Sequence, residues 1–116
     1  MRRRVWSVGL AFGAISAASM ANAAVFSTSA STVASIDTYT QYGQGDIRFH
    51  LTSNSLQASC PYGFWIRETD GGGKSAYAAV LTAFQTGKSI VVGADTSTTW
   101  SGAGSAACLV WDVVSQ

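Results

Sequence analysis

The sequence predicts a mainly β, exported single domain in which one helix interrupts five strands. Three observations carry this prediction. β-Branched and aromatic residues gather in five short runs, one apolar stripe has helical spacing, and two cysteines follow an N-terminal segment typical of secretion. Of the 116 residues, 47% are apolar and 11% are charged, which excludes a disordered chain.

The first 23 residues have the three parts of a secretory signal peptide. Arg2-Arg3-Arg4 form a basic start, residues 5–18 are apolar, and Ala21-Asn22-Ala23 fits cleavage before Ala24. The alternative is an uncleaved anchor, but a spanning helix needs about 20 apolar residues and this run is shorter. We therefore expect residues 24–116 to form the mature domain, secreted or periplasmic and without a membrane span.

The first two strands are predicted on either side of a glycine turn. Residues 24–32 are small and polar, typical of a loose arm, and Val33–Tyr42 forms the first strand. Gly43-Gln44-Gly45 is a turn signal. Asp46–Thr52 alternates strictly between apolar and polar residues, which places His50 on the solvent face of the second strand.

The helix is predicted between the third and fourth strands. Gly63–Glu68 is the third strand, and a run of glycines ends it. Ser75 is a suitable N-cap and Gly87 a suitable stop. The expected buried stripe has helical spacing, at Tyr77, Val80, Leu81 and Phe84.

The fourth and fifth strands are separated by a long polar loop. Ser89–Ala94 is the fourth strand, and Leu109–Ser115 is the fifth. Trp111 alternates in phase with Leu109 and Val113, so its ring is expected inside the fold. The loop, residues 96–107, is rich in Ser, Thr and Gly.

The order β-β-β-α-β-β is that of the OB-fold, a five-stranded Greek-key barrel. In that barrel the third and fifth strands are parallel neighbours. Cys60 precedes the third strand and Cys108 opens the fifth, so the barrel brings them together. A disulfide between them would contribute about 4 kcal/mol on the chain-entropy model. The alternative is two buried thiols.

Several classes of function are disfavoured by composition. Without the signal, four basic residues face six acidic ones, and a net charge of −2 does not suit nucleic acid. We expect no metal, no cofactor and no catalytic residues. A small secreted hydrolase, with His50, Glu68 and Asp70 as its candidates, is the least favoured alternative. Gly73-Lys74-Ser75 is not a phosphate-binding loop, because Glu68 stands where that motif needs glycine.

The long loop is the first candidate for a ligand site. Trp100 lies among Thr98, Thr99 and Ser101, which together offer an aromatic face and hydroxyls, a pairing suited to sugars. OB-folds bind ligands at the loops joining strands 1–2 and 4–5, which adds Tyr42 beside the first turn. The alternative is that Trp100 folds back as a structural plug.

The segment of residues 75–92 resembles the helix-to-strand region of the B subunits of AB5-type toxins, in particular the subtilase cytotoxin and pertussis-like group. The shared features are a Tyr near the helix start, a central Leu, Thr-Gly-Lys at its end and an apolar strand. The resemblance implies a non-enzymatic subunit that forms a homo-oligomeric ring, binds cell-surface glycans and accompanies an A-type toxin subunit. It also implies a sugar pocket on the first strand, near Ser31, Thr32 and Ser35.

The preferred hypothesis is therefore a secreted, non-catalytic, glycan-binding module. The alternative from a different class is a self-assembling or protein-interaction module of the envelope, without glycan binding.

Overall fold

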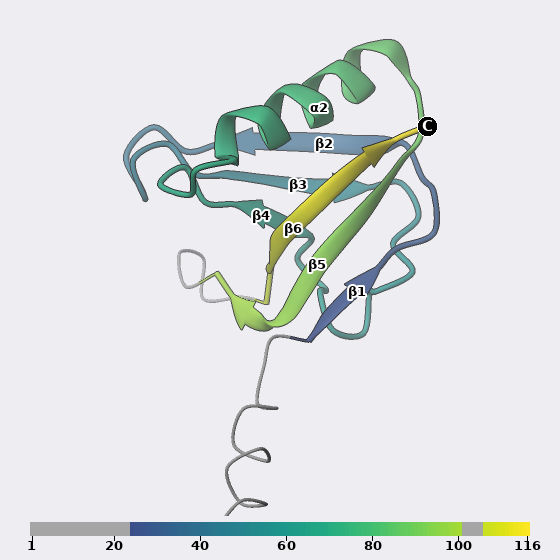
Figure 1. The fold of residues 1–116 in the computed structure, drawn as a ribbon, viewed down its shortest axis with the longest axis horizontal. Helices are drawn as coiled ribbons and strands as arrows, with labels where there is room; N and C mark the ends of the chain where they lie inside the picture. The colour runs from purple at the N-terminus through teal and green to yellow at the C-terminus, as the bar shows by residue number, and fades with distance from the viewer. Residues whose placement is uncertain (1–23, 101–105) are drawn as a thin grey trace, which may run out of the picture.

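The computed structural model describes residues 24–100 and 106–116, which form a twisted six-stranded sheet and a helix packed against it (Figure 1). The elements are β1 (Val25–Ser27), β2 (Val33–Thr38), β3 (Ile47–Leu51), β4 (Phe64–Ile66), α2 (Gly73–Thr86), β5 (Ile90–Thr99) and β6 (Cys108–Ser115). The strand order is β1-β5-β6-β4-β3-β2. Strands β4 and β6 run parallel, and the other neighbours are antiparallel.

The predicted disulfide and parallel pair are confirmed together. Cys60 and Cys108 are bonded, with their Cα atoms 5.5 Å apart. Phe64 lies opposite Cys108 in the β4–β6 ladder, so the disulfide lies where the two parallel strands begin. The mainly β class and the single interrupting helix are confirmed as well.

The number of strands and the closure of the sheet differ from the prediction. The N-terminal arm contributes β1, which pairs with β5 through Val25 and Asp95. The Ser- and Thr-rich arm has no alternating pattern of strand length, but it contains the strand-forming residues Val25 and Phe26, which pairing with β5 fixes as β1. The edge strands β1 and β2 are not paired with each other in the described part of the chain, so the sheet is open. The closed five-stranded barrel stays a prediction.

The start of the helix also differs. Helix α2 begins at Gly73 and its N-cap is Gly72, which supplies no side-chain hydrogen bond, so Ser75 is not the cap. Gly73 is buried so close to the Arg67 carbonyl that a Cβ would come within 2.9 Å of it. The predicted stop is confirmed, because Gly87 has left-handed φ of 70° and donates its N–H to the Ala83 carbonyl.

The buried face of α2 is rotated from the predicted stripe. Val80 and Ala83 are buried in the main core, and Ala76 and Tyr77 pack against that core. Leu81 and Phe84 lie on the flank, half-buried and exposed respectively. Small residues on this face allow the helix to lie close to the sheet, a preference that a search for large apolar residues does not detect.

A β-bulge in β6 reverses the predicted orientation of Trp111. Gly93 pairs with Asp112, but Ala94 pairs with Val110, so Trp111 is an extra residue without a partner in the β5–β6 ladder. Leu109 and Val113 consequently pack in different clusters, and the Trp111 side chain is 64% exposed. The expectation that Trp111 is internal is therefore wrong.

Removal of the disulfide is expected to lower stability strongly. Replacing Cys60 and Cys108 together with Ser should reduce the free energy of unfolding by roughly 2–5 kcal/mol, because both sulfurs are buried and the bond closes a long loop. Urea unfolding of the oxidised and the Ser-substituted proteins measures this difference. Equal midpoints for the two proteins would contradict it.

Candidate functional site

The candidate site lies on the face of β2 and β3 that is turned away from the main core. On β3, Ile47 and Phe49 are buried in that core, so the alternating residues Arg48 and His50 belong to the opposite face. We call the latter the outer face. Two pairs of residues face each other across it, Asp37 with Arg48 and Ser35 with His50.

The first of these pairs is an ion pair. Arg48 donates from Nη2 to Asp37 Oδ2 at 2.8 Å and from Nε to the same oxygen at 3.2 Å. The Asp37 side chain is more exposed than the Arg48 side chain, 43% against 17%. Burial, reinforced by the Arg48 charge, lowers the pKa of His50. The lowered pKa favours the neutral imidazole of His50 at pH 7. The positive charges near this face are those of Arg48 and of Arg67, whose Cζ atom is 5.4 Å from the centroid of the Trp65 ring.

Arg48 also lies over a cluster of aromatic rings, which we call the aromatic cluster: Tyr39, Tyr42, Trp65 and Trp100. Its Cζ atom is 5.7 Å from the centroid of the Trp100 ring and 5.9 Å from that of Tyr39. Tyr39 and Trp100 pack with centroids 4.9 Å apart. Tyr42 meets Trp100 edge-on, at 5.6 Å and 90°.

The two loops expected to form the ligand site thus meet. The backbone N–H of Trp100 donates to the Ala107 carbonyl at 2.8 Å, which holds the indole at the β5–β6 connection. Tyr42 comes from the β2–β3 connection, where Gly43, Gln44 and Gly45 all have positive φ. A Cβ on Gly43 would strike the Asp46 carboxyl group, so this tight path requires glycine.

Asp46 fixes that loop to the underlying strands. Its carboxylate is buried and accepts hydrogen bonds from Trp65 Nε1 at 2.9 Å and from the Glu68 N–H at 3.0 Å. The Asp46 carbonyl accepts the Tyr39 N–H at 2.9 Å. The Asp46 carboxylate therefore fixes the Trp65 ring, and the Asp46 backbone fixes the backbone of Tyr39.

Trp100 itself is 3% exposed. The Trp100 ring is therefore not the exposed sugar-binding platform that was expected. Its burial fits the alternative, in which Trp100 folds back as a structural plug. The indole N–H is buried and has no acceptor among the described residues. The exposed ring of the cluster is that of Tyr42, at 42%.

The hydroxyls predicted beside Trp100 are only partly available. Thr98 donates to Asp95 Oδ2 at 2.9 Å, so it stabilises the end of β5. Thr99 is exposed and pairs with Cys108 in the ladder. Ser101 lies outside the described residues.

The first-strand hydroxyls implied by the resemblance have separate positions. Ser31 is buried; its Oγ accepts the Ser53 N–H at 2.9 Å and donates to the Thr32 carbonyl. Thr32 and Thr52 share a hydroxyl–hydroxyl bond of 2.8 Å. The side chains of Ser31 and Thr32 therefore join the segment before β2 to the residues that follow β3. Ser35, opposite His50, is the one of the three that lies exposed on the outer face.

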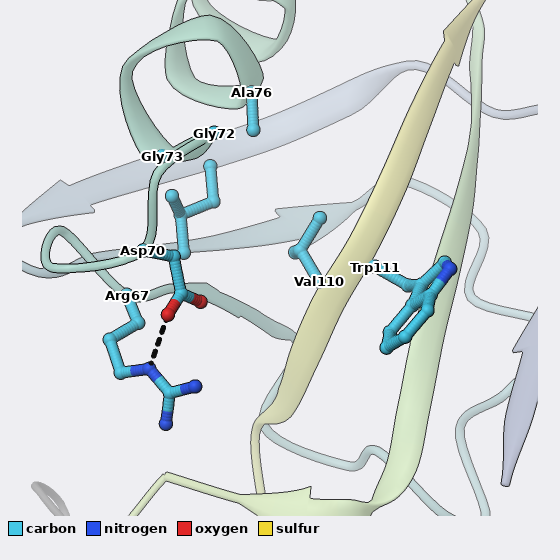
Figure 2. A pocket seen from close by; sticks show the side chains of 8 residues that line it. Arg67, Asp70, Gly72, Gly73, Ala76, Val110 and Trp111 are labelled. Carbon is cyan, nitrogen blue, oxygen red and sulfur yellow. Dashed lines mark hydrogen bonds and ion pairs between the residues drawn. The ribbon is translucent and has the colours of Figure 1, made fainter. Parts of the chain in front are cut away.

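A second feature, which the sequence did not indicate, is a pocket of about 140 Å³ beside the start of α2. Ile66, Ala76 and Val110 give it apolar walls, and the Arg67–Asp70 ion pair of 2.9 Å lies at its side (Figure 2). The ring of Trp111 lies on the other side of the β6 ribbon in this view. Asp70, one of the hydrolase candidates, is thus engaged by Arg67.

Asp37, Tyr39 and Arg48 were not singled out from the sequence. The one available signal was the strict alternation of β3, which already turns Arg48 outward.

In the described ranges, no group of three or more His, Cys, Asp or Glu side chains is arranged to hold a metal ion. None of the helices in those ranges has the length and apolarity needed to cross a membrane. No family model, curated protein or solved structure matches the chain.

Proposed function

We propose that the chain is an exported, non-catalytic binding module whose outer face binds a glycan. The observation that carries the proposal is the meeting of an exposed ring, Tyr42, with the Arg48–Asp37 pair over one aromatic cluster. The apolar C–H face of a sugar packs on an aromatic ring, and neighbouring hydroxyls bond to guanidinium and carboxylate groups. Ser35 and His50 extend the same face with further hydrogen-bonding groups.

The charge of this face favours sugar over nucleic acid. OB-folds bind both classes of ligand, but phosphate backbones require several unpaired cations. Arg48 is already neutralised by Asp37 at 2.8 Å, and the mature chain carries a net charge of −2. Uncharged or sparsely charged hydroxyl-rich ligands fit these groups better.

The OB-fold barrel also belongs to this proposal. Ser31 forms a two-way backbone bridge with Ile90, and Thr28 donates its N–H to the Val92 carbonyl at 2.8 Å. These bonds support a single bent first strand, made of β1 and β2, that joins both edges of the sheet. In such a barrel, the β2–β3 and β5–β6 connections correspond to the loops through which OB-folds bind ligands. A ring of copies and an A-type toxin partner stay expectations from the resemblance alone.

A glycan array and three matched variants test the proposal. Tyr42→Ala and Arg48→Gln should each weaken binding to the glycan found on the array about tenfold, as expected for a contact residue. Tyr62→Ala is the control, because Tyr62 is 50% exposed and lies outside the aromatic cluster. It should bind within about twofold of the unmodified protein.

Melting temperatures accompany each affinity, so that loss of binding is separated from unfolding. Two results would overturn the proposal: no glycan retained by the folded protein, or Tyr42→Ala and Arg48→Gln binding as well as Tyr62→Ala does.

A further inference from the structure

Asp95 is a buried carboxylate that receives several hydrogen bonds but has no side-chain cation as a partner. It is 5% exposed and lies near the middle of β5. Its Oδ1 accepts the N–H of Ser97 at 2.9 Å and the Ser97 hydroxyl at 2.6 Å, and its Oδ2 accepts from Thr98. Neither ion pair formed by the described residues includes it.

The backbone of Ala24 lies against this carboxylate. Val25 is paired with Asp95 across β1 and β5, and the Ala24 carbonyl accepts both the N–H of Thr96 at 2.9 Å and its hydroxyl at 3.2 Å. The Ala24 backbone amide lies close enough to the Asp95 carboxylate to contribute to the lowering of its pKa, after the Ser97 and Thr98 hydrogen bonds. Ala24 is thus held to β5 through its carbonyl oxygen, and its nitrogen lies on the side of the Asp95 carboxylate.

Ala24 is also the residue at which the sequence predicts the mature chain to begin. We propose that the amino group released by cleavage after Ala23 remains at this position and forms an ion pair with Asp95. Hydrolysis by a signal peptidase breaks the Ala23–Ala24 amide bond with one water molecule. The water oxygen ends in the Ala23 carboxylate, and the Ala24 nitrogen leaves as an amine that takes up a proton at neutral pH.

The change in charge occurs where the fold has a buried negative charge. Before cleavage the Ala24 nitrogen offers Asp95 one neutral amide N–H, and after cleavage it offers an ammonium group with three donors. Strand β1 has no charged residue, and the other carboxylate near this part of the sheet is Asp112 of β6, opposite Gly93. Signal removal therefore completes the contact between β1 and β5, and the mature domain is more stable than the same domain with a blocked amino group.

The test compares the mature chain with a free Ala24 amino group and the same chain Nα-acetylated. The α-amino pKa, followed by NMR of ¹⁵N-labelled Ala24, should lie about one unit or more above the ordinary value of about 7.7–8.0. Acetylation should lower the urea midpoint at pH 6–7. Because the folded pKa is raised, the advantage of the free amine should be present below pH of about 8 and be lost as the pH rises through the folded value.

Asp95→Asn and Asp112→Asn are the matched variants. Asp95→Asn also disturbs the bond from Thr98, so its own stability is not the readout. The readout is the difference in urea midpoint between the free and acetylated forms of each variant. This difference should vanish in Asp95→Asn and persist in Asp112→Asn. An ordinary α-amino pKa, an acetylation effect that survives in Asp95→Asn, or an exported protein that begins at a residue other than Ala24 would each overturn the proposal.

Discussion

Val80→Asp is expected to prevent folding. The Val80 side chain is fully buried on the face of α2 that packs into the main core, together with Phe49 and Phe64. An unpaired carboxylate there costs several kcal/mol, which is comparable with the whole stability of a small domain. Circular dichroism and thermal melting of the purified variant should show neither native signal nor a cooperative transition.

Leu81→Asp is the matched variant for this prediction. Leu81 is adjacent in sequence but half-buried on the flank of α2, so its carboxylate keeps access to water. We expect it to fold, with a loss of roughly 1–2 kcal/mol. A folded Val80→Asp protein and an unfolded Leu81→Asp protein would mean that α2 is rotated by about one residue from the position described.

Trp100→Ala is expected to lower the free energy of unfolding by roughly 3–5 kcal/mol, the range for a buried aromatic residue. The indole packs against Tyr39 and Tyr42 and lies under the Arg48 guanidinium, so its removal leaves a cavity on the outer face. Urea unfolding measures the loss. If Trp100→Ala kept the stability of the unmodified protein and lost only glycan binding, Trp100 would instead be an exposed ligand platform.

Trp100→Phe separates the ring from its N–H group. Phenylalanine keeps an aromatic ring in the cluster and removes a buried donor that has no acceptor among the described residues. Leaving such a donor unsatisfied costs about 1–3 kcal/mol, so its removal offsets part of the lost packing. We expect a destabilisation clearly smaller than that of Trp100→Ala.

The parts of the fold that could be predicted are those with a local or covalent cause. Strict alternation identifies β3, and Gly87 ends α2 because it adopts left-handed φ at no steric penalty. The predicted export and the two cysteines indicated the disulfide, and the β-β-β-α-β-β order indicated the parallel pair, with which the positions of Cys60 and Cys108 agree. Each of these signals is contained in a few neighbouring residues or in one bond.

The remaining features depend on contacts between distant segments. The bulge at Trp111 is set by pairing with β5, and one extra residue reverses every later side chain in β6. Trp100 is buried by Tyr39 and Tyr42, about sixty residues earlier in the chain, so nothing beside it in sequence indicates burial. The Arg48–Asp37 pair likewise exists only because β2 and β3 align in that register.

Glycan binding to the outer face, beside Tyr42 and the Arg48–Asp37 pair, can be mapped residue by residue. The most direct measurement is an NMR titration of the ¹⁵N-labelled mature protein with the glycan that the array identifies. We expect the largest shifts at Asp37, Tyr42 and Arg48. Shifts that gather instead at Asp70, Gly72 and Ala76, around the pocket beside α2, would contradict this prediction.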